Sequence, residues 1–331
     1  MWGALFPGQG SQSVGMGRFL FEEFQSAREL FEQASDTLSQ NFKTLCFEGP
    51  ESDLQLTQNT QPALLLVSVA SFRVLGQLVP FAPQMGAGHS IGEYAALVAS
   101  DVIPFDAALK AVRRRGQEMQ QAVPVGEGAM CAVLGLADDV VRKLCELVEK
   151  ESGFAPLEPA NFNTPGQVVV SGSAKAIDWM RNNVKQDWLT EKLGEPAGKP
   201  KFIPLAVSAP FHCSMMKPAE RAMADVLNAI EFKLPRFHVV QNLTASISSD
   251  PAMIRTRLIG QISGAVLWSQ CQSQMIQSGV TQYIEFGNGK VLTGLLKKIS
   301  AEHPSVTLQS FNLNSLEDIK TIEAQFKGGL A

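Results

Sequence analysis

The sequence predicts an α/β fold, in which a large unit with a mostly parallel sheet carries a smaller inserted α+β unit. Strand-like apolar runs alternate with helical patterns over residues 1–125 and again over residues 206–331. Between them, residues 126–205 follow the order β-α-β-α-β, which is typical of a small split βαβ unit. We therefore expect a discontinuous large domain, 1–125 and 206–331, interrupted by a small domain, 126–205.

The N-terminal part of the large unit begins with a short buried strand and a Gly-rich turn. A largely apolar helix follows two amphipathic ones, and a short strand then leads to Ser90. The last helix ends where Pro124 and Gly126 break its pattern. The expected elements are strand 2–6, turn 7–12, helices 14–24, 27–38 and 62–78, a strand before residue 90 with a helix after it, and helix 105–122.

The small unit and the C-terminal part follow the same reasoning. Residues 194–201 hold two prolines and two glycines, which predicts a flexible loop. The small unit is expected to contain strand 129–133, helix 137–149, strand 167–171, helix 174–193 and strand 202–207. The C-terminal part is expected to contain helix 218–230, strand 239–241, helix 252–262, strand 283–286, helix 291–299, strand 307–311 and helix 316–326.

Composition excludes several classes of protein. The chain has 331 residues, of which 45% are hydrophobic, so it can bury a large core. A net charge of −4 gives no electrostatic reason to expect nucleic-acid binding. The five cysteines are scattered without C-x-x-C spacing, so we expect no disulfides, no zinc site and no other bound metal. This cysteine usage fits a reducing cytoplasm best. The start is no secretory signal, and the longest apolar run, 62–72, is too short to cross a membrane.

The motif G-x-S-x-G at residues 88–92 is the first candidate for chemistry. A nucleophilic serine needs a sharp turn between strand and helix, and Gly88 and Gly92 allow close packing there. The helix that follows directs free N–H groups toward Ser90, where an oxyanion would form. The same five residues also fit an ordinary Gly/Ser turn, so other residues have to support the assignment.

A serine nucleophile needs a base, and the chain has four histidines. His89 is expected to support the turn, His238 to be structural at the head of a strand, and His303 to lie solvated in a polar loop. His212 follows an apolar strand that ends at Pro210, and ligand sites of α/β folds gather at such strand ends. Structure and catalysis remain equal alternatives for His212.

Helical spacing separates Arg115 from its two arginine neighbours. It lies three residues after Val112 and four before Met119, on the apolar face, whereas Arg113 and Arg114 are rotated toward solvent. A buried guanidinium must be paired or bind an anion. An internal salt bridge and a substrate carboxylate are therefore both open.

Taken together, these residues resemble the malonyl-CoA:acyl carrier protein transacylase family. Two further segments, 161–167 and 287–292, also resemble family segments. Four motifs match in order across nearly the whole chain: Phe6-Pro-Gly-Gln-Gly-Ser-Gln12, Gly88-His-Ser-Ile-Gly-Glu-Tyr94, the arginine of Arg115-Gly-Gln-Glu-Met119, and Ser208-Ala-Pro-Phe-His-Cys213.

The resemblance implies a role for each matching position. Ser90 would carry the malonyl group as an ester, with His212 as base and then acid, and the backbone carbonyl of Gln261 would orient the histidine. Arg115 would pair with the malonate carboxylate. The remaining roles are the oxyanion-hole N–H groups of Gln9 and Ile91, and a wall beside the substrate formed by Phe211.

The resemblance also implies a fold, partners and a reaction. The large domain would be α/β-hydrolase-like and the small domain ferredoxin-like. The partners would be malonyl-CoA and acyl carrier protein, in a ping-pong reaction that supplies fatty-acid synthesis. No cofactor, nucleic acid or membrane is expected, and a monomer is the default.

Three other functions remain as alternatives. A serine esterase or thioesterase would use His303 with Asp250 or Glu285, but it leaves Arg115 without a role. A polyketide-type trans-acting acyltransferase would share the motifs. A docking module without chemistry is disfavoured, because Ser90, His212 and Arg115 are all present.

Overall fold

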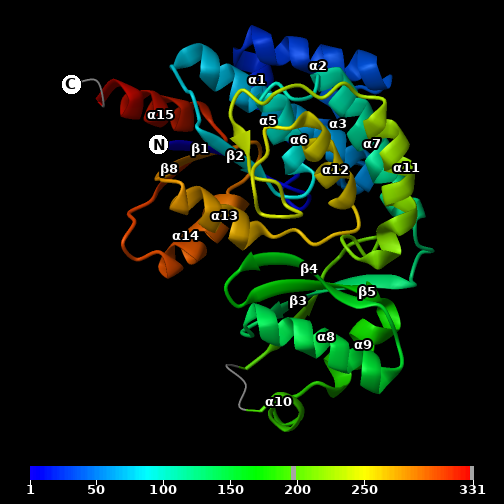
Figure 1. The fold of residues 1–331 in the computed structure, drawn as a ribbon. Coiled ribbons are helices and arrows are strands. Elements are labelled where there is room, and N and C mark those ends of the chain that lie inside the picture. The colour runs from blue at the N-terminus through cyan, green and yellow to red at the C-terminus, as the bar shows by residue number, and fades with distance from the viewer. Residues whose placement is uncertain (195–198, 329–331) are drawn as a thin grey trace.

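The computed structural model describes residues 1–194 and 199–328, and Figure 1 shows their arrangement. Two sheets organise the chain. The strands are β1 (Trp2–Phe6), β2 (Met85–Gly88), β3 (Gly128–Leu134), β4 (Leu157–Thr164), β5 (Gln167–Ser173), β6 (Lys201–Pro204), β7 (His238–Val239), β8 (Gln282–Phe286) and β9 (Gln309–Leu313). The helices before the second sheet are α1 (Arg18–Glu23), α2 (Gln25–Leu38), α3 (Phe42–Phe47), α4 (Glu51–Gln55), α5 (Thr57–Leu78), α6 (Gly92–Ala99) and α7 (Phe105–Gln121). The later helices are α8 (Asp138–Ser152), α9 (Ala174–Asn183), α10 (Gln186–Leu193), α11 (Lys217–Asn228), α12 (Pro251–Gly260), α13 (Trp268–Gln277), α14 (Val291–Ile299) and α15 (Leu316–Gly328), with 3-10 turns at Ser214–Met216 and Ser300–Glu302.

The larger sheet is parallel and has helices on both faces. Its strand order is β7-β2-β1-β8-β9, so β1 pairs with β2 on one side and with β8 on the other. Side chains of β1 alternate between the faces, as the period of a strand requires. Ala4 and Phe6 pack in the core that contains α5, α6 and α7, whereas Leu5 packs with α13 and α14. This confirms the predicted α/β alternation around a mostly parallel sheet.

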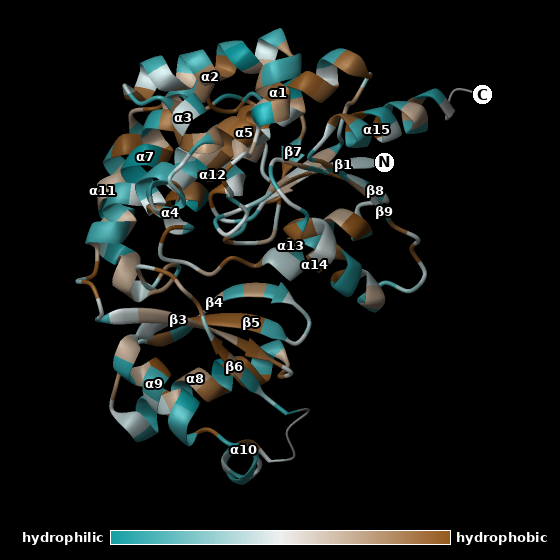
Figure 2. Cartoon of the chain, turned by 180° about the vertical axis from the view of Figure 1, so that it is seen from behind, coloured by the Kyte–Doolittle hydropathy of each residue, from teal (hydrophilic) through white to brown (hydrophobic). Residues whose placement is uncertain are grey.

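Helix α5 is the most apolar long helix of the large layer. Among the described residues it is also the one helix that is long and apolar enough to cross a membrane, and 78% of its apolar window is buried in the protein. Figure 2 shows apolar residues along α5, with more hydrophilic ones on the outward α2. The burial is that of a core helix.

The smaller sheet is antiparallel, with strand order β4-β5-β3-β6. Helices α8 and α9 pack on one face of it and form a separate apolar core with the strands. In Figure 1 this sheet lies below the larger layer, with α8 and α9 on its far side. It touches the larger layer through β4, because Phe162 N–H donates to the Val266 carbonyl and Val266 N–H donates to the Ala160 carbonyl.

Several predicted elements differ from the structure. The predicted helix 174–193 is two helices, α9 and α10, separated by extended residues Val184 and Lys185. The first helix starts at Arg18 rather than at residue 14, because Gly15 and Gly17 take positive φ angles of 97° and 75°. Residues 195–198 of the predicted loop 194–201 lie outside the described residues, and Lys201 already belongs to β6.

The sequence analysis missed strand β4 and helices α3, α4 and α13. Strand β4 contains Pro159 and two asparagines, which are poor strand formers, and its pairing with β5 shifts register beside Pro159. The smaller unit therefore has the order β-α-β-β-α-α-β, with one more strand than predicted.

Three parallel strands place the candidate site residues. The carboxyl end of β1 leads to Pro7 and Gln9, that of β2 leads to Ser90, and that of β7 leads to Gln241 and Asn242. Because neighbouring parallel strands end at the same edge of a sheet, these segments meet there.

Candidate active site

Ser90 lies on a sharp turn between β2 and α6. Its φ angle is 52°, in the left-handed region that non-glycine residues rarely adopt. The two glycines of the motif make this turn possible. A Cβ at Gly88 would lie 1.9 Å from the backbone of Gly92, and a Cβ at Gly92 would lie 2.1 Å from the Phe6 carbonyl oxygen. No larger side chain fits at either position without moving the strand or the helix.

His212 and the Gln261 backbone complete a hydrogen-bonded chain that starts at Ser90. The His212 Nε2 atom lies 2.7 Å from Ser90 Oγ, and Nδ1 lies 2.9 Å from the Gln261 carbonyl oxygen. A carbonyl oxygen can only accept, so Nδ1 carries the proton and donates it. The neutral ring therefore offers Nε2 as the acceptor of the Ser90 hydroxyl proton. This is the geometry of a nucleophile with its general base.

The environment keeps His212 neutral. His212 is 5% exposed, and burial, with a further contribution from the Arg115 cation, lowers its pKa from 6.5 to about 3. The hydrogen bond to the Gln261 carbonyl opposes this shift but is smaller. A neutral imidazole at ordinary pH is the form that can remove a proton from serine.

Arg115 is buried on the apolar face of α7, as its helical spacing predicts, and is 2% exposed. Its Nη1 donates to Gln61 Oε1 at 2.9 Å, and its Nη2 donates to Ser90 Oγ at 3.1 Å and to Gln261 Oε1 at 3.0 Å. Its Nε has no hydrogen-bond partner among the described residues. Neutral oxygens hold the cation, so the salt bridge considered from the sequence is not among its recorded contacts.

Arg113 was expected to be solvated, and this is wrong. It is half-buried, and it donates to Asn59 Oδ1 at 2.6 Å and to Gln40 Oε1. Arg114 is exposed, as predicted, and pairs with Glu118 on the next turn of the helix.

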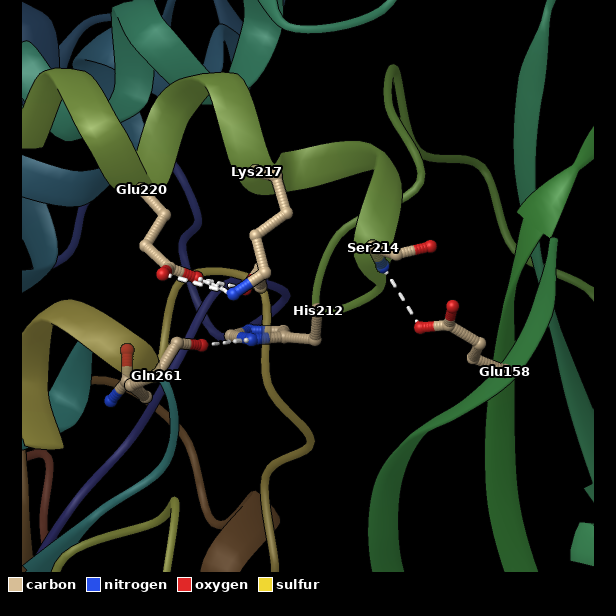
Figure 3. Close-up of polar contacts among 7 residues, drawn as sticks. Glu158, His212, Ser214, Lys217, Glu220 and Gln261 are labelled. Atoms are coloured by element: carbon tan, nitrogen blue, oxygen red, sulfur yellow. Dashed lines mark hydrogen bonds and ion pairs between the residues drawn. The ribbon is translucent and has the colours of Figure 1, made fainter.

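The loop that carries His212 is fastened from two sides (Figure 3). Glu158, on strand β4 of the smaller sheet, accepts a 2.8 Å hydrogen bond from Ser214 N–H. On the other side, Glu220 of α11 binds Lys217 at 2.7 Å and Ser263 Oγ, two residues after Gln261. These contacts support a His212 backbone whose φ angle is 60°.

A cavity of about 120 Å³ opens between the two sheets at Ser90. Its polar wall brings together residues that are far apart in the sequence, including Gln9, Ser90, Arg115 and His212. Its apolar wall comes from both units: Ile91, Met119, Met130, Leu205, Val207 and Phe211. The structure thus gathers the candidate nucleophile, base and cation in one small cavity, with Gln9, Ile91 and Phe211 beside them.

The other three histidines lie outside this chain of hydrogen bonds. His89 Nε2 lies 2.9 Å from Asn163 Oδ1 of strand β4, and burial lowers the pKa of His89. His238 is exposed, and His303 is half-buried against Ser273 Oγ.

The acids required by the esterase alternative are used elsewhere. Asp250 accepts from Ala252 N–H at the start of α12, and Glu285 accepts from Leu292 and Thr293 N–H. The imidazole beside Ser90 Oγ is that of His212, not that of His303.

Two further residues at the site were not found from the sequence. Asn242 Oδ1 accepts from Ser90 N–H at 2.8 Å, and its Nδ2 donates to the Gly88 carbonyl at 2.8 Å, so one side chain braces both ends of the turn. Glu93 is fully buried beside it. An acid directly before the apolar run 94–99, and an asparagine directly after a predicted strand, were the available signals.

Comparison with known families gives a match over most of the chain. Residues 4–285 match the family model described as acyl transferase domain. A malonyl CoA-acyl carrier protein transacylase of Bacillus subtilis is 41% identical over 299 residues, 89% of each chain. The transacylase of the same name from Staphylococcus aureus is 41% identical over 316 residues, 96% of each chain.

Solved structures give the same result. An acyl carrier protein S-malonyltransferase from Vibrio cholerae superposes with a TM-score of 0.88 at 41% identity, covering 97% of this chain and 99% of that one. A malonyl-transacylase in complex with its type II PKS acyl-carrier protein also has a TM-score of 0.88, at 39% identity, covering 98% of this chain and 99% of that one.

Proposed function

The chain belongs to the acyltransferase family of malonyl-CoA:acyl carrier protein transacylases, and from this we infer that it transfers malonyl groups from malonyl-CoA to the phosphopantetheine thiol of an acyl carrier protein. One observation carries the inference beyond the names of the relatives. Ser90 Oγ lies 2.7 Å from a neutral imidazole and 3.1 Å from a buried guanidinium that donates its hydrogen bonds to neutral oxygens. This arrangement supplies a nucleophile, its base and a carboxylate partner.

In the first half-reaction, Ser90 Oγ attacks the thioester carbonyl of malonyl-CoA and gives its proton to His212 Nε2. Charge develops on the carbonyl oxygen, and we propose that the backbone N–H groups of Gln9 and Ile91 stabilise it. Ile91 lies at the N-terminus of α6, where N–H groups are free and the helix dipole favours an anion. The C–S bond then breaks, and the CoA sulfur takes the proton from His212.

In the second half-reaction, the carrier thiol attacks the malonyl ester on Ser90. His212 removes the thiol proton as the C–S bond forms. The ester C–O bond breaks, and the proton returns to Ser90 Oγ. The Gln261 carbonyl holds the ring in the same tautomer throughout, which is the role we assign to it.

Arg115 and Phe211 would select the acyl group. The malonyl carboxylate lies at the end of a short acyl chain attached to Ser90 Oγ, within reach of the guanidinium that contacts this oxygen. Phe211 lines the same cavity and is adjacent to His212 in the sequence. Its ring would disfavour a branched acyl group.

We also propose a fold type for each of the two domains, and a cellular location and an oligomeric state for the protein. Five parallel strands with helices on both faces support an α/β-hydrolase-like large domain, 1–125 and 206–331. The antiparallel order β4-β5-β3-β6, with two strands between its helices, supports a ferredoxin-like small domain, 126–205. Five buried free cysteines are compatible with a cytoplasmic location, and a monomer is the state that we propose.

The function is tested by mixing the protein with malonyl-CoA, with and without a holo acyl carrier protein. We expect the malonyl carrier to form at the rate of CoA release, and expect CoA release to stop after one turnover when the carrier is absent. Equally fast CoA release without the carrier, ending in free malonate, would instead identify a thioesterase. A carrier from polyketide synthesis as the preferred acceptor would favour the polyketide alternative over fatty-acid synthesis.

A further inference from the structure

The side chain of Gln261 has contacts that its backbone role does not explain. In Figure 3 its carbonyl faces His212 while its side-chain amide points away from the ring. The amide Oε1 accepts from Arg115 Nη2 at 3.0 Å. The amide Nε2 donates to the Ser90 carbonyl at 3.0 Å and to Glu93 Oε2 at 2.9 Å. One residue therefore touches the base through its backbone, and the nucleophile turn and the cation through its side chain.

Glu93 determines which way this amide points. The acid is fully buried in the first turn of α6. It accepts from three N–H donors: Gln241 Nε2 at 3.2 Å, Asn242 N at 2.8 Å and Gln261 Nε2 at 2.9 Å. Both oxygens of the acid already accept from N–H donors, and one of these donors is the backbone N–H of Asn242, which can only donate. The nitrogen of the Gln261 amide therefore faces the acid. The amide oxygen is then left to face Arg115.

We propose that Glu93 is a positioning residue for substrate selection: it fixes the Gln261 amide so that Arg115 is held by a neutral oxygen and keeps its charge for the substrate carboxylate. The inference rests on the proposed malonyl transfer and deepens it. Glu93 touches neither the substrate cavity nor the reacting atoms. It acts through Gln261.

The reason for an indirect contact is electrostatic. An acid in direct contact with Arg115 would satisfy the guanidinium and compete with malonate for it. An amide placed between the two leaves the guanidinium N–H groups without a carboxylate as direct hydrogen-bond partner. Gln61 Oε1 does the same on the other side, at 2.9 Å from Nη1. A reversed Gln261 amide would place two donors against each other, at a buried position where an unmade hydrogen bond is costly.

Two variants separate the side chain from the backbone. In Glu93→Gln the shape is kept, but an amide replaces the carboxylate, so the Gln261 orientation is no longer enforced. In Gln261→Ala the backbone carbonyl that holds His212 is kept, and the side chain is lost. We expect kcat/KM for malonyl-CoA to fall about tenfold in each, the loss of one charge-assisted hydrogen bond. Gln261→Glu should lose more, because it brings an acid into contact with Arg115.

Glu285→Gln is the matched control. Glu285 is also fully buried and accepts from backbone N–H groups, at 3.0 Å from Leu292 and 2.8 Å from Thr293, but it lies on β8 and does not line the cavity. It measures what loss of a buried carboxylate does to folding alone. Thermal unfolding of all variants is recorded in parallel.

The readout compares malonyl-CoA with a reagent that carries no carboxylate. The rate of Ser90 modification by phenylmethylsulfonyl fluoride reports the nucleophile and its base without Arg115 recognition. We expect Glu93→Gln and Gln261→Ala to lower malonyl transfer far more than this rate, and expect the ratio to be unchanged in Glu285→Gln. Equal loss of both rates in the Glu93 and Gln261 variants, or no loss of malonyl transfer, would overturn the inference. Failure of the proposed function is distinct, since the unmodified chain would then transfer no malonyl group.

Discussion

Replacing Arg115 by alanine tests how the acyl group is chosen. Arg115 is 2% exposed, and its guanidinium lines the cavity at Ser90 and donates to Ser90, Gln61 and Gln261. In Arg115→Ala the malonyl carboxylate would enter a cavity without a cation. We therefore expect malonyl transfer to fall, and transfer of an uncharged acetyl group to gain in relative terms.

The magnitude follows from the contact that is lost. A hydrogen bond between charged groups contributes about 1.5–3 kcal/mol, so kcat/KM for malonyl-CoA should fall roughly 10- to 150-fold. A second effect accompanies the first. The Arg115 cation contributes to the low pKa of His212, so this pKa should rise in the variant.

The assay measures kcat/KM for malonyl-CoA and acetyl-CoA with the same holo carrier. Arg114→Ala is the matched control, because its side chain on the same helix is 56% exposed and pairs with Glu118 at 2.6 Å. Such a surface pair contributes about 0.3–0.5 kcal/mol, so this control should keep its malonyl preference. An unchanged ratio of malonyl to acetyl transfer in Arg115→Ala would refute the role of the arginine.

Three further predictions follow from the site. Because the pKa of His212 is about 3 rather than 6.5, kcat/KM should stay level as pH falls through 6.5, and a loss of activity with an apparent pKa of 6.5 would contradict this. The free energy of unfolding should decline as pH falls below 6.5, since the histidine of the unfolded chain binds a proton there and that of the folded chain does not. Gly92→Ala should abolish malonyl transfer and lower the melting temperature, because the added Cβ would lie 2.1 Å from the Phe6 carbonyl oxygen. In the control Gly294→Ala the added Cβ meets open space, so this variant should keep both its transfer activity and its melting temperature. Phe211→Ala should reduce the preference for malonyl-CoA over methylmalonyl-CoA by about 1–3 kcal/mol, and an unchanged ratio of kcat/KM would rule out a selective role for the ring.

The sequence was sufficient for features that depend on periodicity and on motifs. The apolar spacing around Arg115 placed it on the buried face of α7, and the apolar runs at 2–6 and 283–286 are strands of the parallel sheet. These patterns hold because one face of each element is buried. The motif around Ser90 was sufficient to predict the turn, since only glycine, which has no Cβ, fits at positions 88 and 92.

The missed features depend on tertiary contacts. Strand β4 has poor strand formers and is held by its neighbour β5 and by the segment at Val266. Arg113 was assigned to solvent from helical rotation alone, but it is met by Asn59 of α5 and by Gln40, which follows α2. Glu93 and Gln261 are 168 residues apart, and no local pattern shows that the two side chains touch.

Mass spectrometry of the acylated protein is the closest test of the proposed mechanism. The protein is mixed with malonyl-CoA, quenched in acid and digested, and the experiment is repeated after adding a holo carrier. We predict one malonyl group on the peptide that contains Ser90, which disappears as the malonyl carrier forms and is absent from Ser90→Ala. No adduct, an adduct on another peptide, or an adduct that the carrier does not discharge would contradict transfer through a Ser90 ester.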